Sequence, residues 1–402
     1  MLNKARFHRL LSSLDRPRLL RISLALVLAL AVGVLSATVA AQPPTQGVDI
    51  PDPPSLNARG YLLVDYDSGA ILAEHNADEP LEPASLTKIM TAYVVFRELA
   101  AGNLQLADEA LVSEKAWRTG GSKMFIEVGK RVSIEDLLKG MIVQSGNDAS
   151  VALAEHIAGA EDSFADMMNR EAARLGMTRS HFVNAPGLPD PEHYTTPRDI
   201  ARVTAAIVRE FPEYYAWYSL PSFTYNDIEQ SNRNRLLALD PSVDGVKTGH
   251  TQAAGYCLVT SAERDGRRLI SVVMGTASDA ERVADSQALL NYGFNFFETH
   301  RPFPGGEPLE TLRVWGGDTQ RLPVGPARDL YITIPRGQYP VLSAALKPAG
   351  EITAPVGWGD VVGEIVFRLD ETEIRREPAV ALADVGRGNF LQRSWDAVLR
   401  LF

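Results

Sequence analysis

The stretch "GYLLVDYDSGAILAEHN" (60–76) decides the fold, because it contains two apolar runs around a turn of aspartate, serine and glycine. A second pair of β-rich runs, "AGYCLVTSAERDGRRLISVVMG" (254–275), is joined by a short charged turn. The sequence between these two hairpins is mainly helical in character. We therefore expect an α+β domain whose antiparallel sheet takes strands from both ends of the segment.

The helical block is predicted from apolar residues at helical spacing and from residues that start helices. Ser133 precedes one helix as an N-cap, with Asp136 three residues further on. Pro197 stands at the first position of another helix, after a threonine cap. A further strand is expected at 222–227. The expected helices cover residues 85–99, 132–144, 148–157, 163–175, 195–211 and 280–296.

The sequence pattern changes after residues 301–308, "RPFPGGEP". Short β-branched runs separated by glycine, proline and aspartate predict a small all-β domain of roughly 80 residues. We assign residues 58–298 to the α+β domain and 299–387 to the β domain. The last stretch, 388–402, has apolar residues at helical spacing, which predicts an amphipathic helix. Such a helix lies either in a membrane interface or against the β domain, and the sequence leaves both open.

The N-terminus has the features of an export signal. Basic residues in 1–21 precede an apolar stretch at 22–41 that ends with small residues at Val39 and Ala41. This order predicts a secretory signal peptide, residues 1–41, cleaved after Ala41, with a retained signal anchor as the alternative. The proline-rich residues 42–57 are expected to form a flexible lead. The mature protein is then predicted to be exported.

Composition excludes several classes of function. The net charge is −10 and no basic stripe is interleaved with aromatic residues, so we expect no nucleic-acid partner. Cys257 is the single cysteine, which rules out an intrachain disulfide. The seven histidines are scattered without metal-ligand spacing, so no metal site is expected.

Ser85 and Lys88 are the first candidate catalytic pair. At positions i and i+3 of a helix their side chains share a face and can form a hydrogen bond. A serine needs a base to remove its proton before it becomes a good nucleophile. Lysine can act as that base when burial or nearby positive charge lowers its pKa. The chain has only eight lysines, but a Ser-x-x-Lys pair alone is a weak signal.

Two further motifs strengthen this interpretation. "SGN" (145–147) lies between two predicted helices, where a loop can present a hydroxyl and an amide to a cleft. "KTGH" (247–250) is expected just before the strand at 254–262, where its glycine lets a ligand approach the backbone. This ordered trio is the one found in serine β-lactamases and penicillin-binding proteins.

With these motifs, the sequence resembles the D-alanyl-D-alanine carboxypeptidases of the low-molecular-mass penicillin-binding proteins, the type with an added C-terminal β domain. The stretches "EPASLTKIMTAYV", "MIVQSGNDAS" and "DGVKTGHTQAAGY" carry the resemblance, which extends over essentially the whole mature chain. It implies a catalytic domain like that of serine β-lactamases. It also implies a periplasmic enzyme that removes the terminal D-alanine from peptidoglycan stem pentapeptides, with no metal or organic cofactor.

The resemblance assigns a role to each motif residue. Ser85 would attack the penultimate D-alanine carbonyl with Lys88 as general base. The backbone N–H groups of Ser85 and His250 would form the oxyanion hole, and Gly249 lies beside them. β-Lactams would acylate the same serine.

The remaining motif residues would handle the proton and the substrate. Ser145 would relay a proton to the departing amine, and Lys247 would tune that network. Asn147 would hold the amide on the acyl side, and Thr248 would bind the terminal carboxylate together with Arg282. The alternative to this binding role is that Arg282 is an ordinary solvated arginine on a surface helix.

Other residues are assigned less firmly by the sequence. Arg233 matches a family pattern but is equally consistent with a structural role, and His193 and Asp199 are expected to be a loop and a helix residue. The stretch 113–129 is shorter than in the best-known relatives, so we expect a loop bordering the cleft to differ.

Alternative functions share the trio. A peptidoglycan D,D-endopeptidase or transpeptidase would use the same residues, and a catalytically quiet peptidoglycan or β-lactam sensor could keep the fold. A β-lactamase is disfavoured because no Glu-x-x-Leu-Asn lies between Asn147 and Lys247 to activate a deacylating water. We therefore predict that the acyl-enzyme formed with a β-lactam is hydrolysed slowly.

Overall fold

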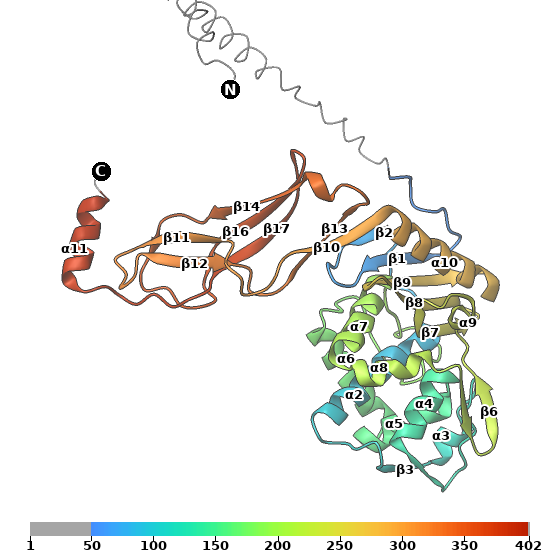
Figure 1. The fold of residues 1–402 in the computed structure, drawn as a ribbon. Helices are drawn as coiled ribbons and strands as arrows, with labels where there is room; N and C mark the ends of the chain where they lie inside the picture. Colours follow the sequence, from blue (N-terminus) through green and yellow to red (C-terminus); the bar gives the residue numbers. More distant parts are fainter. Residues whose placement is uncertain (1–49, 401–402) are drawn as a thin grey trace, which may run out of the picture. The chain divides into compact units, whose positions relative to one another are not determined.

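The computed structural model describes residues 50–400 of the chain. The first domain contains a five-stranded antiparallel sheet in the order β2-β1-β9-β8-β7 (Figure 1). The prediction that this sheet takes strands from both ends of the segment is confirmed. Its strands are β1 (Gly60–Asp65), β2 (Ile71–His75), β7 (Val243–Thr251), β8 (Gly255–Arg264) and β9 (Arg267–Thr276).

Helices cover both faces of the sheet (Figure 1). Because side chains alternate along a strand, Leu62 packs in the core shared with the helical block, whereas Leu63 packs in the core shared with α10 (Asp279–Phe296). The helices of the block are α2 (Thr87–Ala100), α3 (Glu114–Arg118), α4 (Ile134–Val143), α5 (Asn147–Ala158), α6 (Glu161–Arg174), α7 (Pro197–Glu210), α8 (Pro212–Tyr215) and η2 (Ala216–Ser219), and α9 (Leu236–Leu239) precedes β7.

The predicted N-caps of two helices are confirmed by the structure. Ser133 accepts a hydrogen bond from the Asp136 backbone N–H and caps α4, and Thr196 caps α7 with Pro197 next to it. One prediction needs correction: Ser85 lies in a 3₁₀ turn, η1 (Ala84–Leu86), ahead of α2. The "KTGH" motif precedes the predicted strand, which is β8, as expected. It also lies on a strand of its own, β7, which was not predicted.

Short strands also went unpredicted. β5 (Ser222–Tyr225) was expected, but its hairpin partner β6 (Ile228–Ser231) was not. The pair β3 (Glu109–Leu111) and β4 (Arg131–Ser133) brackets the segment that contains α3. These strands are only three or four residues long, so they carry little alternating pattern of their own.

The C-terminal part is a separate all-β domain, as predicted, and ends in a helix. Its larger sheet has the order β14-β16-β17-β12-β11-β15, and β10 pairs with β13. The bounds are β10 (Phe297–Phe303), β11 (Glu310–Trp315), β12 (Arg321–Gly325), β13 (Leu330–Pro335), η3 (Tyr339–Val341), β14 (Leu342–Pro348), β15 (Ile352–Thr353), β16 (Val361–Leu369), β17 (Thr372–Ala381) and α11 (Phe390–Leu399).

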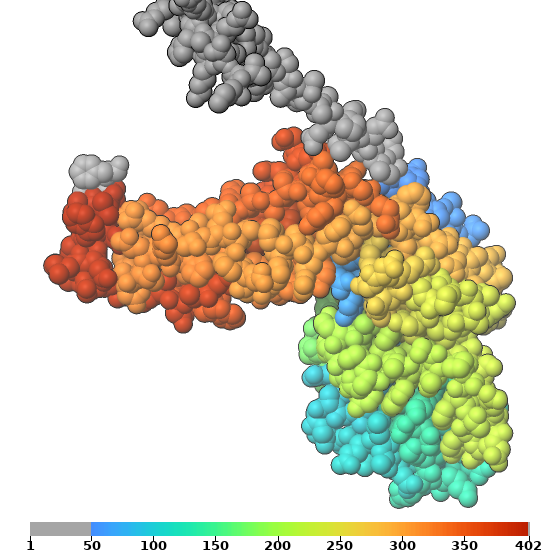
Figure 2. All heavy atoms as spheres, viewed as in Figure 1, coloured from blue at the N-terminus to red at the C-terminus, as the bar shows by residue number. Residues whose placement is uncertain are grey.

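Within α11, the predicted amphipathic helix, Asn389 and Gln392 form a capping box, and Asp396 is the only buried residue. Figure 2 shows α11, in red, at one end of the β domain, which is drawn mainly in orange. Phe390, Leu391 and Trp395 are exposed. The predicted signal peptide lies outside the described residues. Between residues 50 and 400, no helix is both long enough and apolar enough to cross a bilayer.

Candidate active site

The turn that carries Ser85 is shaped by close backbone approaches. Ala84, just before it, has a φ of +46°, which L-residues rarely adopt. A side chain on Gly187 would place its Cβ 1.9 Å from the Ala84 carbonyl oxygen, and one on Gly249 would come within 3.0 Å of the Pro83 carbonyl oxygen. Glycine at these two positions therefore allows a loop and strand β7 to close on the Ser85 turn from two sides.

Lys88 lies one turn further on and is fully buried. Its Nζ is 2.9 Å from Ser85 Oγ, 2.7 Å from Asn147 Oδ1 and 2.7 Å from the Pro186 carbonyl oxygen. The amide and carbonyl oxygens can only accept hydrogen bonds. A neutral amine has two N–H groups for these two acceptors and one lone pair. That lone pair is then left for the Ser85 hydroxyl, which can donate.

The surroundings of Lys88 favour the neutral amine. Burial lowers the pKa of Lys88 well below its ordinary value, and the positive charges of Lys247 and Arg233 lower it further, although Asp148 opposes them. Burial, with Arg233 and Arg282 nearby, also lowers the pKa of Lys247 to about 7. A cleft with two buried lysines is thus arranged to hold one of them as a base.

The "SGN" segment joins α4 to α5 at the edge of the site. Ser145 is buried with a φ of +67°, an uncommon conformation that often occurs at functional sites. Asn147 donates through Nδ2 to the Gly120 carbonyl oxygen at 2.7 Å, while its Oδ1 receives Lys88. Asn147 therefore links the catalytic lysine to the loop that follows α3.

The "KTGH" segment lies on β7, the edge strand of the sheet, so one side of its backbone has no partner strand. Lys247 Nζ is buried and donates to the Thr248 carbonyl oxygen at 3.1 Å. His250 is exposed, and its ring lies 4.0 Å from that of Tyr256. The open edge of β7 faces the Ser85 turn through Gly249.

Arg282, at the start of α10, is buried at the other side of the cleft. Its Nη1 donates to the carbonyl oxygens of Gly249 and Cys257, at 3.0 and 3.2 Å, and it pairs with Asp279. The alternative of a solvated surface arginine is therefore wrong. These bonds tie α10 to the strand that carries the "KTGH" motif.

The predicted residues come together in one cavity of about 340 Å³. Ser85, Ser145, Thr248, Gly249, His250 and Arg282 line it, together with Ser122, Asn232, Arg233, Arg235 and Asp279. The other three predicted residues, Lys88, Asn147 and Lys247, are buried and contact residues of this lining or of each other. The structure thus gathers all nine predicted residues.

Sequence reasoning undervalued some contributors. Arg233 lines the cleft, where its Nε donates to the Gln144 carbonyl oxygen at 3.0 Å. The carbonyl of Pro186 binds Lys88 although the two residues are 98 positions apart, and a backbone group leaves no signature in the sequence. Of these, only the family pattern around Arg233 offered a signal.

Two residues that were set aside are structural. His193 is buried, accepts a hydrogen bond at Nδ1 from the Val183 N–H, and lies 2.8 Å from Thr87 Oγ1. Burial lowers its pKa to about 4, so the ring is neutral and its Nε2–H donates to Thr87 at the start of α2. Asp199 accepts from the Arg179 N–H and the Ser180 hydroxyl beside α7.

A serine in reach of a buried lysine, beside a positively charged cleft at a sheet edge, defines a serine acyl-transfer enzyme. Comparison with known families agrees. Residues 47–278 match the model of the D-alanyl-D-alanine carboxypeptidase peptidase family, and residues 297–387 match the C-terminal domain of penicillin-binding protein 5. The chain belongs to the D-alanyl-D-alanine carboxypeptidase family, as its motifs predicted, and is a serine-type carboxypeptidase.

Individual relatives cover most of the chain. It is 45% identical to the D-alanyl-D-alanine carboxypeptidase DacC of Escherichia coli, over 87% of this chain and 89% of that one. The crystal structure of penicillin-binding protein 5 from Haemophilus influenzae matches with a TM-score of 0.82 and 42% identity, covering 84% of this chain and 100% of the other. An ampicillin-bound penicillin-binding protein D2 from Listeria monocytogenes matches with a TM-score of 0.56 and 30% identity, covering 61% of this chain and all of that one.

Proposed function

We propose that this protein removes the terminal D-alanine from peptidoglycan stem pentapeptides through an acyl-enzyme on Ser85. The observation that carries the proposal is the contact between Lys88 Nζ and Ser85 Oγ, at 2.9 Å, with two pure acceptors on the other sides of the amine. As general base, Lys88 takes the hydroxyl proton while Oγ bonds to the penultimate D-alanine carbonyl carbon.

The tetrahedral intermediate then breaks down within the cleft. Backbone N–H groups of Ser85 and His250 stabilise its oxyanion. The C–N bond breaks, and Ser145, with Lys247 adjusting the network, passes a proton to the departing D-alanine amine. Water hydrolyses the resulting ester. Asn147 positions both Lys88 and the acyl-side amide.

The terminal carboxylate of the substrate is proposed to bind at the positively charged end of the cleft. Thr248 supplies a hydroxyl there, and Arg233, which lines the same cavity, would contact the carboxylate. Nη1 of Arg282 donates to the Gly249 and Cys257 carbonyl groups and Nη2 pairs with Asp279, so we assign this side chain to positioning β7. It still adds positive charge to the site.

Covalent inhibition by β-lactams follows from the same chemistry. Among the described residues that line the cleft, Asp279 is the only carboxylate, and it pairs with Arg235 and Arg282. A carboxylate held by two arginines is a poor base for activating water. We therefore expect the penicilloyl ester on Ser85 to be long-lived.

The test compares D-alanine release from a pentapeptide with cleavage of a crosslinked peptide dimer, using Ser85→Ala as the inactive control. The proposal predicts release from the pentapeptide, no release by Ser85→Ala, and a stoichiometric penicillin adduct by mass spectrometry. Preferential cleavage of the dimer would favour the endopeptidase alternative. Adduct formation without any peptide cleavage would favour the sensor, and rapid penicillin turnover would contradict slow deacylation.

We also propose that the protein is exported, with cleavage after Ala41, and that it binds the outer face of the inner membrane through α11. The exposed side chains of Phe390, Leu391 and Trp395 supply an apolar face. Arg393 and Arg400 lie on the other face of α11, the face of Asp396, where they line a cavity with Trp315.

Sedimentation with lipid vesicles tests this attachment. The protein should sediment with vesicles containing phosphatidylglycerol. Replacing Phe390, Leu391 and Trp395 by serine should abolish sedimentation, whereas Trp358→Ala, an equally exposed tryptophan of the β domain, should not. Equal binding by all three proteins would contradict the proposal.

A further inference from the structure

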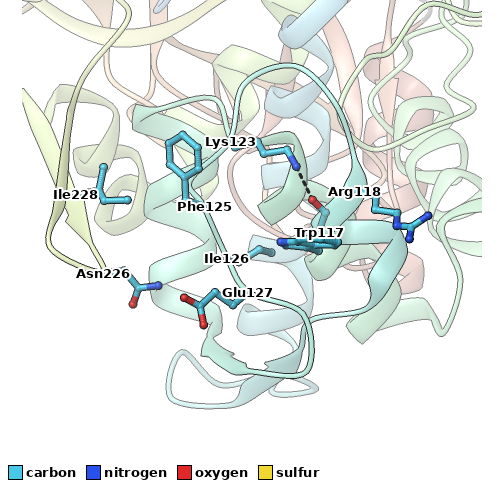
Figure 3. A pocket seen from close by; sticks show the side chains of 8 residues that line it. All are labelled: Trp117, Arg118, Lys123, Phe125, Ile126, Glu127, Asn226 and Ile228. Atoms are coloured by element: carbon cyan, nitrogen blue, oxygen red, sulfur yellow. Dashed lines mark hydrogen bonds between the residues drawn. The ribbon is translucent and has the colours of Figure 1, made fainter.

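A second cavity, of about 510 Å³, lies along the loop that follows α3 (Figure 3). Three large apolar side chains line it while remaining accessible: Trp117 is 42% exposed, Phe125 49% and Ile228 41%. Polar side chains surround them, namely Arg118, Lys123, Glu127 and Asn226. Exposed aromatic rings framed by hydrogen-bonding groups are typical of ligand grooves rather than of a protein surface with no partner.

This groove and the catalytic cleft are lined by neighbouring residues of one loop. Ser122 lines the cleft and its neighbour Lys123 lines the groove. The Lys123 carbonyl oxygen accepts a hydrogen bond from Gln230 on β6, the strand that begins with Ile228. The two walls of the groove, the loop and the β5–β6 hairpin, are thus held together at the edge of the active site.

The same loop is fixed to the "SGN" segment. The Asn147 N–H donates to the Ser122 carbonyl oxygen at 2.7 Å. The buried Asp148 carboxylate accepts from three successive backbone N–H groups, those of residues 124–126, at 3.0, 3.0 and 3.3 Å. Asp148 directly follows Asn147, which binds the catalytic lysine. The groove is therefore positioned by the residues that position the base.

Phe125 adopts a conformation that costs free energy. Its φ is +68°, in the left-handed region that bulky residues avoid at a cost of roughly 1–3 kcal/mol. The hydrogen bonds to Asp148 hold this backbone in place, yet the ring is left half exposed in the groove. Burial of the ring does not explain the strained backbone, whereas presentation of an aromatic face to a ligand does.

We propose that this groove binds the sugar end of the substrate, the N-acetylated amino sugars from which the stem peptide extends. The inference rests on the proposed carboxypeptidase function. The apolar face of a pyranose ring would pack on Trp117 and Phe125, and Glu127 and Asn226 would hydrogen-bond to hydroxyl and acetamido groups. The four stem residues between the scissile carbonyl and the sugar span roughly 14 Å when extended, so the sugar lies outside the cleft that holds the scissile bond.

The test compares kcat/KM for two substrates, a free pentapeptide and the same pentapeptide attached to its disaccharide. We expect the wild-type protein to prefer the disaccharide-linked substrate by about tenfold, equivalent to about 1.4 kcal/mol. Trp117→Ala should bring the ratio of the two kcat/KM values close to one, Phe125→Ala should reduce it, and Trp117→Phe should retain most of it. Trp358→Ala is the matched control and should leave the ratio unchanged.

A binding measurement separates this inference from the proposed reaction. Calorimetry of the disaccharide-linked pentapeptide with Ser85→Ala protein reports affinity without turnover, and adding Trp117→Ala should weaken it about tenfold. Wild-type protein that released no D-alanine, together with this loss of binding, would contradict the proposed reaction. The same result would support sugar binding in the groove. Equal kcat/KM for both substrates, or parallel loss on both with Trp117→Ala, would overturn the groove. That parallel loss would point to peptide rather than sugar in it.

Discussion

The active-site cleft and helix α11 depart from ordinary burial in opposite directions. The cleft region encloses two lysines, Lys88 and Lys247, each about 2% exposed, although lysine is almost never fully buried. Helix α11 instead exposes Phe390, Leu391 and Trp395 to solvent, each more than 60% accessible. Each departure weakens the fold locally. In the cleft the buried charge serves chemistry, and on α11 the exposed apolar face is suited to a surface that the isolated protein lacks.

The largest effect is expected from removing the titratable amine in the cleft. Arginine at position 88 would keep its positive charge at every accessible pH, so it could not accept the Ser85 proton. Lys88→Arg should therefore slow penicillin acylation by about a thousandfold or more, as measured by stopped-flow or by intact-protein mass spectrometry. Lys139→Arg, on the surface of α4, is the matched control. Acylation at the wild-type rate by Lys88→Arg would remove Lys88 as the base.

The next largest effect concerns the backbone that delivers Ser85. Gly187→Ala would place a Cβ 1.9 Å from the Ala84 carbonyl oxygen, so the Ser85 turn must move. Acylation should fall about a hundredfold, since small displacements of a reacting group cost that much. Gly102→Ala is the control, because Gly102 also has a positive φ, +74°, but no atom within 4 Å of the added Cβ. Equal effects of the two changes would show that backbone strain, not the Ser85 turn, is responsible.

The burial of both lysines also predicts a coupled pH dependence. The neutral Lys88 needed as base forms as pH rises through its lowered pKa, so acylation should increase with pH along this limb. The charge of Lys247 helps lower that pKa. In Lys247→Gln the pKa of Lys88 should rise, and the midpoint of the limb should move to higher pH. Lys347→Gln, an exposed lysine of the β domain, should leave the midpoint in place. A shift to lower pH in Lys247→Gln would contradict the proposed coupling.

What the sequence predicted depends on how local the signal is. The caps at Ser133 and Thr196 and the hairpins at 60–76 and 254–275 depend on neighbouring residues, and they were located correctly. Strand β7 was missed because "VDGVKTGHT" is largely buried, so it does not alternate between apolar and polar residues.

The missed parts of the site have a different cause. The Pro186 carbonyl that binds Lys88, and Gly187 beside it, reach the site through tertiary packing. A backbone oxygen or an absent side chain has no residue-type signature. The nine predicted residues carry recognisable side chains within short motifs, which is why the sequence alone brought them together.

The smallest effect we predict returns to α11 and its single buried carboxylate. Asp396 accepts from the Gly316 N–H at 2.7 Å and lies 3.4 Å from Arg313, so it fastens the helix to the β domain while the apolar face points away. Asp396→Ala should lower the free energy of opening α11 by about 1–3 kcal/mol, measured by hydrogen exchange of residues 390–399. D-Alanine release should not change. The exposed Glu371→Ala is the control. Unchanged protection in Asp396→Ala would mean that apolar contacts hold α11, and its exposed face would then be less available to a membrane than the comparison with the cleft implies.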